Sequence, residues 1–434
     1  MSRPRTFTGL VACVLLSWTG IAHADAVTDW NAIAIQTIVN GLPVHPGATS
    51  ALDAAMVQAA VYDAVVAIEG GFKPYAVRIP GAHGSTAAAV AKATHDVLVN
   101  RFPSATTVAS VDTAYHTYLF NNGLAEDDPG VAVGAQAAAG IIALRANDGS
   151  FPANPPVFVG SNDPGVWRPT TSYQPGPPPS GAPMLAPWLG SVTPFTLKSP
   201  SQYRPQPPPP LTSKRYTDAY NEVKALGARF NSARTADQTE LGLFWYANYF
   251  ILWNQALRDI ADAHLHNIAD TARLFALVQL AVTDAVITAW DSKLHFAFWR
   301  PVSAVQEGNS DGNPRTIGDP SWQPFQNTPN YPDYTSGANN ATGATTRALA
   351  LFFGTDEMTF TVHTTNPAAQ NQTRTFDRFS DAAAEVVVAR IYEGIHFRFA
   401  DEEARKQGRH VAQWAFGHFL RPLDDDQGED DDDQ

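Results

Sequence analysis

The stretch Lys293-Leu-His-Phe-Ala-Phe-Trp-Arg300-Pro301 closes a long apolar helical pattern with two permanent cations. Periodicity predicts one helix over residues 271–299, so Lys293 and Arg300, seven residues apart, lie within about 20° of each other on one face. Pro301 is predicted to stop that helix. Two cations placed in this way can bind one anion, Arg300 as a planar fork and Lys293 as a point charge. An exposed basic face stays open as the alternative for this pair alone.

A serine–glycine pair precedes the next helical pattern in the stretch Pro332-Asp-Tyr-Thr-Ser336-Gly337-Ala338. Ser336 or Thr335 is a candidate N-cap, and the free backbone N–H groups at a helix start form an anion site. Gly337 lets the backbone approach a ligand closely. The alternative is an ordinary cap and turn.

A third cation and an imidazole lie in the stretch Arg390-Ile-Tyr-Glu-Gly-Ile-His396. On an uninterrupted helix, Arg390 and His396 would point about 120° apart. Gly394 between them offers a break that lets both side chains converge on one site. Taken alone, this spacing is equally compatible with a histidine that has only a structural role.

The three stretches together resemble a known signature. The order K-x6-R-P, then a Ser-Gly turn, then R-x5-H resembles the vanadium-dependent haloperoxidase and type 2 phosphatidic acid phosphatase superfamily. Four further segments resemble the bacterial haloperoxidase-like branch and extend the resemblance over most of the chain: Ala51–Tyr75, Glu222–Gly227, Phe244-Trp245 and Phe275–Val302.

The resemblance implies a vanadate site that phosphate can also occupy. Six residues would bind the oxyanion: Lys293, Arg300, Ser336, Gly337, Arg390 and His396. In this family pattern His396 is the apical vanadium ligand, or the nucleophile on phosphorus in a phosphatase. Trp290 would line the halide side of the pocket, so His396, Lys293 and Trp290 are the catalytic candidates.

The departure from the family pattern is Ala338, where a Ser-Gly-His motif would place a proton-handling histidine. General acid–base help of that kind is worth about 10²–10⁴-fold in rate. Asn339 or Asn340 can donate hydrogen bonds but cannot titrate at a useful pH. His295 and Asp333 are the candidates to replace the missing group.

The expected function is that of a haloperoxidase-like enzyme that uses hydrogen peroxide to oxidise halide for an organic acceptor, with activity weakened or altered by Ala338. An acid phosphatase is the first alternative, disfavoured because expelling a poor alkoxide leaving group demands an acid. A catalytically degenerate protein that binds phosphate or vanadate is the second. Tyr331 stands five residues before Ser336, where chloroperoxidases of this family have Phe and bromoperoxidases have His, so halide preference stays open.

Composition and the N-terminus suggest where the protein works. Arg3 and Arg5, an apolar run over residues 10–21 and Ala22-His23-Ala24 predict a signal peptide over residues 1–24, cleaved after Ala24. We therefore expect a secreted or periplasmic protein. The net charge of −13 argues against a nucleic-acid partner. No later segment is predicted to span a membrane.

The rest of the chain alternates between helical patterns and one long irregular region. Residues 150–211 contain two proline runs, so we expect a Pro-rich segment that wraps over the surface. Helices are predicted over residues 50–68, 85–100, 131–146, 216–226, 236–264, 271–299, 341–353, 376–391 and 400–419. The expected fold is an all-α helical bundle in one domain, residues 25–423, with the anion-site half in residues 270–420. The acidic residues 424–434 are expected to form a disordered tail.

Overall fold

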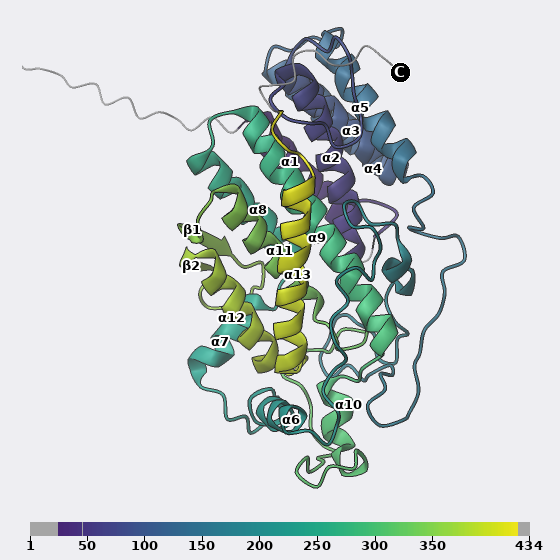
Figure 1. The fold of residues 1–434 in the computed structure, drawn as a ribbon, viewed down its shortest axis with the longest axis vertical. Helices are drawn as coiled ribbons and strands as arrows, with labels where there is room; N and C mark the ends of the chain where they lie inside the picture. The colour runs from purple at the N-terminus through teal and green to yellow at the C-terminus, as the bar shows by residue number, and fades with distance from the viewer. Residues whose placement is uncertain (1–24, 46, 424–434) are drawn as a thin grey trace, which may run out of the picture.

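The computed structural model describes residues 25–45 and 47–423 (Figure 1). Its helices are α1 (Ala26–Asn40), α2 (Ser50–Glu69), α3 (Thr86–Arg101), α4 (Ala105–Asn121), α5 (Pro129–Arg145), α6 (Lys214–Leu226), α7 (Ala236–Trp245), α8 (Tyr249–His264), α9 (Ile268–Phe296), α10 (Pro301–Gln306), α11 (Gly337–Phe352), α12 (Phe379–Tyr392) and α13 (Arg398–His418). The all-α prediction is confirmed. The predictions for residues 1–24 and 424–434 lie outside the described residues.

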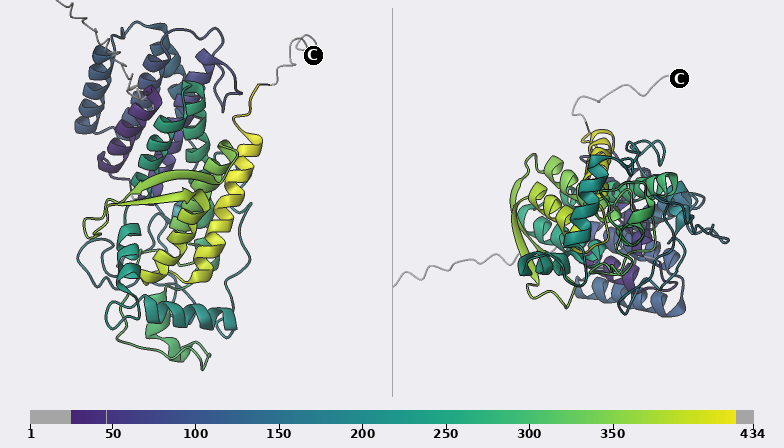
Figure 2. Two further views of the ribbon diagram at one scale, coloured as in Figure 1. Left: turned by 90° about the vertical axis from the view of Figure 1, so that its left-hand side faces the viewer. Right: turned by 90° about the horizontal axis from the view of Figure 1, so that it is seen from below.

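A small antiparallel hairpin accompanies the helices. It consists of β1 (Glu357–His363) and β2 (Thr373–Arg378), with Phe360 paired to Phe376. The hairpin lies on one side of the helical body, where β1 contacts α8 and β2 contacts α12 (Figure 2). The predicted helix over residues 376–391 is therefore too long, because Phe376 belongs to β2 and α12 begins at Phe379.

Helix α9 is the central element of the core and packs against α2, α11 and α13. Figure 1 shows α1–α5 gathered at one end of an elongated molecule and α6, α7, α10 and α12 toward the other. By length and composition, α9 and the segment Gly47–Glu69 could each cross a membrane, but 89% of the apolar window of each is buried in the protein. Such burial is what a core helix of a folded domain requires.

Helices α11 and α13 approach each other closely because glycines line their contact. A Cβ on Gly343 would lie 2.5 Å from the backbone oxygen of Arg405, and one on Gly408 would lie 2.1 Å from that of Asn340. Larger residues at these positions would force the helices apart. The close packing brings the start of α13 next to the start of α11.

The predicted helix over residues 271–299 ends earlier than expected. Helix α9 stops at Phe296, and Ala297 adopts a left-handed conformation with φ 44°. Arg300 is the N-cap residue of α10, whose first residue is Pro301. The prediction that Lys293 and Arg300 share one helix face is therefore wrong. Pro301 begins a helix, because the first helical residue needs no N–H partner.

A second break lies in the predicted helix over residues 236–264. It consists of α7 and α8, separated by Tyr246, Ala247 and Asn248. The Asn248 side chain accepts a hydrogen bond from the backbone N–H of Phe250 (3.0 Å), which caps the start of α8. This break matters because its residues line the cavity described below.

The irregular Pro-rich segment is fastened to α9 by one buried carboxylate. Asp284 accepts hydrogen bonds from the backbone N–H groups of Phe195 (2.7 Å), Thr196 (2.7 Å) and Leu197 (3.1 Å), and from the Thr196 hydroxyl (2.6 Å). Burial raises the pKa of Asp284, and these hydrogen bonds oppose the shift. The segment therefore packs as a fixed part of the fold at this point.

We expect Asp284→Ala to lower the free energy of unfolding by about 3 kcal/mol or more, because it leaves several buried N–H donors without an acceptor. Urea unfolding followed by circular dichroism measures the change. Asp218→Ala is the matched control, since Asp218 is 61% exposed and pairs with Lys214 across one helical turn. The control is expected to stay within about 0.5 kcal/mol of wild type. Equal losses of unfolding free energy in the two variants would contradict the role of Asp284 in fastening the Pro-rich segment to α9.

Candidate oxyanion-binding site

Three buried cations from separate elements meet at one end of α9. Lys293 lies in the last turn of α9, Arg300 precedes α10 and Arg390 lies in the last turn of α12. Their exposed fractions are 0%, 0% and 6%. Buried charge is costly unless it is paired or hydrogen-bonded. We call these cations, together with Ser336, Gly337 and His396, the anion cage.

Backbone carbonyl groups around Tyr331 offset part of the cost of burying these cations. Lys293 Nζ donates to the carbonyl oxygens of Pro332 (2.6 Å) and Asp333 (3.2 Å), and Arg300 Nε donates to that of Tyr331 (2.7 Å). The Tyr331 ring lies beneath both cations, at 4.8 Å from Lys293 Nζ and 4.9 Å from Arg300 Cζ. These contacts orient Lys293 and Arg300 without supplying a counter-charge, and burial together with Arg300 lowers the pKa of Lys293 well below its usual value.

Two guanidinium nitrogens of the anion cage lack a well-formed hydrogen bond in the part of the chain that the structure describes, although the Arg390 guanidinium contacts Tyr249. Among the described residues, none accepts such a hydrogen bond from the buried atoms Arg300 Nη2 and Arg390 Nε. Each unsatisfied buried donor costs about 1–3 kcal/mol, and folded proteins retain few of them. An anion that accepts from both nitrogens would remove this cost, so the residues fit a tetrahedral oxyanion such as phosphate or vanadate.

His396 reaches the anion cage because a glycine ends α12. The helix stops at Tyr392, and Gly394 has φ 80°, so the prediction of a break at Gly394 is confirmed. A Cβ on Gly394 would lie 2.3 Å from the backbone oxygen of Gly227, which excludes a larger residue. His396 is 1% exposed and lies beside Arg300.

The His396 ring is prepared to act as a neutral ligand. Burial lowers its pKa well below the usual value, and Arg300, Lys293 and Arg390 lower it further. Nδ1 lies 2.7 Å from Asp333 Oδ1, and Nε2 lies 3.1 Å from Arg300 Nη1. With its proton on Nδ1, toward Asp333, the ring carries its lone pair on Nε2, the atom that faces Arg300 Nη1.

Ser336 and Gly337 form the N-terminal end of α11. Ser336 occupies the N-cap position but makes no side-chain capping hydrogen bond, so the prediction that it caps the helix is wrong in that detail. Its hydroxyl hydrogen-bonds the Asp401 carboxyl instead. A Cβ on Gly337 would lie 3.3 Å from Trp290 Cζ3, so glycine preserves the space between the helix start and the indole.

Sequence reasoning missed two buried carboxyls beside the anion cage. Glu393 accepts from Arg390 Nη1 (2.6 Å), and burial raises its pKa to about 7 against the effect of Arg390. Asp401, in the first turn of α13, accepts from Asn339 Nδ2 (2.8 Å), and burial together with Asp333 raises its pKa well above the usual value. Glu393 lies three residues after Arg390, and Asp401 lies five residues after His396. This closeness in sequence to two motif residues is the signal that could have identified them.

The two candidates to replace the missing histidine lie in different environments. His295 is exposed, and its ring contacts Phe296. Asp333 is fully buried between His396 and Arg300, and burial raises its pKa to about 7 while Arg300 and Lys293 oppose the shift. Only Asp333, of these two, therefore belongs to the surroundings of the anion cage.

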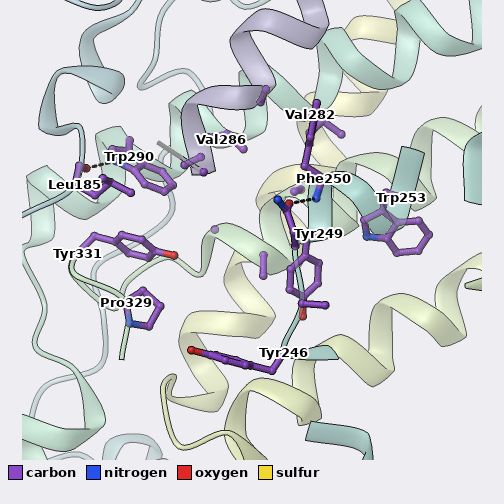
Figure 3. A pocket seen from close by; sticks show the side chains of 18 of the residues that line it. Leu185, Tyr246, Tyr249, Phe250, Trp253, Val282, Val286, Trp290, Pro329 and Tyr331 are labelled. Carbon is purple, nitrogen blue, oxygen red and sulfur yellow. Dashed lines mark hydrogen bonds between the residues drawn. The ribbon is translucent and has the colours of Figure 1, made fainter. Parts of the chain in front are cut away.

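A cavity of about 430 Å³ opens from the anion cage; we call it the apolar cavity. Trp290 and Tyr331 lie together on one wall of it (Figure 3), and the cage residues Gly337 and Arg390 line it as well, with Ala338 next to Gly337. The aromatic side chains Tyr246, Tyr249, Phe250 and Trp253 also line the cavity, and Arg390 Cζ lies 5.5 Å from the centre of the Tyr249 ring. Ala338 adds only a methyl group to this lining.

Comparisons with known proteins identify sequences and structures that this chain resembles. Residues 273–425 match the family model of the VCPO second helical-bundle domain. Over 203 residues the chain is 34% identical to vanadium chloroperoxidase of Curvularia inaequalis, a match that covers 39% of this chain and 32% of that protein. The match thus spans about a third of the length of the curated relative.

Solved structures show the same fold. The first bacterial vanadium-dependent iodoperoxidase superposes with a TM-score of 0.73 at 23% identity, covering 93% of this chain and 97% of that one. A holo-type bacterial vanadium-dependent chloroperoxidase gives 0.69 at 17% identity, covering 89% and 95%. The matched C-terminal bundle and the similarity to the chloroperoxidase support assignment of the chain to the vanadium-dependent haloperoxidase and type 2 phosphatidic acid phosphatase superfamily, and the solved structures show the shared fold.

Proposed function

We propose that the protein is a secreted haloperoxidase-like enzyme that binds vanadate and uses hydrogen peroxide to oxidise halide. The observation that carries the proposal is the pair of buried donors without a well-formed hydrogen bond among the described residues, Arg300 Nη2 and Arg390 Nε, in a cage that also contains a neutral imidazole. The similarity of residues 273–425 to the VCPO second helical-bundle domain and of the chain to vanadium chloroperoxidase supports it. Secretion, with cleavage after Ala24, is tested by N-terminal sequencing of the exported protein.

Each residue of the anion cage has a separate task in this proposal. Lys293, Arg300 and Arg390 neutralise oxyanion oxygens, while the Ser336 hydroxyl and the Gly337 N–H donate hydrogen bonds to them. His396 Nε2 supplies the nitrogen ligand. Bound vanadate would supply a Lewis-acidic centre that activates peroxide toward halide.

Proton handling is assigned to Asp401, because Ala338 has no titratable group. The Asp401 side chain is fully buried, and burial together with Asp333 raises its pKa well above the usual value, which favours the protonated form. Asp401 Oδ1 accepts from Asn339 Nδ2, and the Ser336 hydroxyl hydrogen-bonds the same carboxyl. Asp401 would pass its proton through the Ser336 hydroxyl to a bound ligand.

A protein that only binds oxyanions is the second candidate, and Ala338 is the observation that favours it. The deciding experiment titrates vanadate into the metal-free protein and then measures peroxide-dependent oxidation of bromide and iodide. p-Nitrophenyl phosphate hydrolysis is measured in parallel. Activity toward at least one halide supports the proposal. Robust hydrolysis without any halide oxidation would instead indicate the phosphatase.

The affinity for oxyanions is expected to fall as pH rises. Asp333 and Glu393 have pKa values raised to about 7, so each becomes negative as pH rises through that value and opposes a bound anion. Sulfate is the appropriate probe, because its own charge is constant near neutral pH. We expect sulfate affinity to weaken by roughly tenfold per pH unit for each proton released, between about pH 6 and about pH 8.

Calorimetry in buffers of different ionisation enthalpy measures both the affinity and the proton uptake on binding. Glu393→Gln is the informative variant, since it removes one titrating carboxyl and is expected to flatten the pH dependence. Affinity that is constant with pH, or that is tighter at about pH 8, would contradict the assigned protonation.

A further inference from the structure

We propose that a second anion site, separate from the anion cage, binds a phosphate group in a pocket between α11, α12 and α13. Arg347 of α11 and both Arg405 and Arg409 of α13 line this pocket, which we call the arginine pocket. Its ligand is a free phosphate ion or the phosphate group of a small monoester. The inference is independent of the proposed function, because these arginines belong neither to the anion cage nor to the lining of the apolar cavity.

The arginine pocket has the size of a site for a small ligand. Its volume is about 310 Å³, at the lower limit of small-molecule sites. Ala350 and Ala383 contribute only methyl groups to the lining. The pocket therefore has room for a phosphate group with a short organic substituent and excludes a large ligand.

The close packing of α11 against α13 brings the three like charges together. The two helices begin side by side, and Gly343 of α11 lies against the backbone of Arg405. Arg347 follows Gly343 by one turn, and Arg409 follows Arg405 by one turn. The backbone therefore fixes the arginines around one hollow, although cations one helical turn apart repel each other.

The single acidic side chain of the lining is already engaged. Asp356 accepts hydrogen bonds from the backbone N–H of Ser380 (3.0 Å), from the Ser380 hydroxyl (2.5 Å) and from Arg378 Nε (3.2 Å). These bonds fasten Asp356 to the start of α12. The lining carries three positive charges and one negative charge, so a dianion would balance the remaining charge of the pocket.

Arg347 has a buried donor that a ligand could satisfy. Its Nε is buried, and no described residue accepts a hydrogen bond from it. Burial and repulsion from Arg409 lower the pKa of Arg347, and Asp356 opposes that shift. Buried donors without an acceptor are costly and rare in folded proteins. An anion in the pocket would accept from this nitrogen and reduce the repulsion between the arginines.

Other partly exposed arginines of this protein have carboxylate partners. Arg204 pairs with Asp291 at 2.7 Å, and Arg398 pairs with Glu222 at 2.6 Å. Within the part of the chain that the structure describes, neither Arg405 nor Arg409 lies within salt-bridge distance of a carboxylate. The arginine pocket is thus a local concentration of positive charge on a protein with a net charge of −13.

The chemistry of the arginine pocket favours a phosphate group over a carboxylate. Guanidinium groups from two helices approach from different directions, and a tetrahedral anion offers oxygens to each of them. A carboxylate presents only two oxygens in one plane. A phosphate monoester is a dianion near neutral pH and matches the charge of the lining. The acidic surface elsewhere on the protein repels extended polyanions, so a small phosphate compound is the appropriate ligand.

Calorimetric titration of inorganic phosphate into the full chain, at about pH 8 and in roughly 0.15 M chloride, tests the pocket. Arg405→Gln/Arg409→Gln is expected to bind one equivalent fewer than wild type, whether or not the anion cage also binds phosphate. Arg347→Gln is expected to weaken binding in the pocket by at least about tenfold, because it removes a charged donor. Arg78→Gln/Arg421→Gln is the matched control, since it removes the same charge from two exposed positions outside the pocket.

The results distinguish a built site from general attraction of anions. Equal numbers of bound phosphate ions in wild type and in Arg405→Gln/Arg409→Gln would overturn the site. An equal loss in the control would also overturn it, because the long-range field of the protein would then explain the binding. If a thermal melt shows that the double variant is unfolded, Arg347→Gln decides, and unchanged affinity in that variant overturns the site.

A second titration, with glycerol 1-phosphate, identifies the source of the phosphate group. Binding of the monoester more tightly than inorganic phosphate, with loss in Arg405→Gln/Arg409→Gln, identifies a phosphate monoester as the ligand. Tighter binding of inorganic phosphate identifies the free ion. Because binding is the only readout, a lack of halide oxidation would refute the proposed function without affecting this site.

Discussion

Replacing Ala338 by histidine is expected to raise peroxide-dependent bromide oxidation by about 10²–10⁴-fold, the usual contribution of a positioned acid–base group. Ala338 is the second residue of α11 and lines the apolar cavity, as do Trp290, Tyr331 and Arg390. An imidazole there would titrate near neutral pH. It would therefore supply protons more efficiently than the buried Asp401 carboxyl.

Ala341→His is the matched control for this substitution. Ala341 lies one turn further along the same wall of the apolar cavity and is not part of the anion cage. Its histidine is expected to give no increase in the rate of bromide oxidation. A rate in Ala338→His that does not exceed wild type would mean that proton supply does not limit the native enzyme. A rate that rises from nothing would identify the native protein as an oxyanion binder.

The sequence predicted the constituents of the anion cage better than their geometry. Lys293, Arg300, Arg390 and His396 could be named from spacing and resemblance, and Gly394 predicted the break that brings the last two together. The prediction that Lys293 and Arg300 share one helix face was wrong, because Ala297 adopts a left-handed conformation that ends α9. An alanine is seldom found in that conformation, so local propensity gives no warning of it.

The buried carboxyls beside the anion cage could not be predicted from the sequence, for a different reason. Asp401 reaches Asn339 and Ser336 only because Gly343 and Gly408 let α11 and α13 pack closely. That contact joins residues more than 60 positions apart. Ser336 likewise fails to cap α11 because its hydroxyl finds a tertiary partner. Local rules of capping describe an isolated helix end and cannot anticipate such competition.

Replacing His396 by alanine is expected to lower vanadate affinity by more than about 100-fold and to reduce halide oxidation to background. Loss of groups that merely support metal ligands already costs about 10–100-fold, so loss of the ligand itself should cost more. Sulfate affinity is expected to change by less than about threefold. Lys293, Arg300 and Arg390 remain, and a tetrahedral anion needs their charge rather than the imidazole.

The contrast between vanadate and sulfate distinguishes a ligand from a structural histidine. His396 contacts Asp333 and Arg300, so a structural role predicts that both affinities fall together as these partners rearrange. A thermal melt of the variant identifies such a general loss. His295→Ala is the control, because His295 is exposed and is expected to leave both affinities unchanged. Retained halide oxidation in His396→Ala would refute the assignment of His396 as the nitrogen ligand.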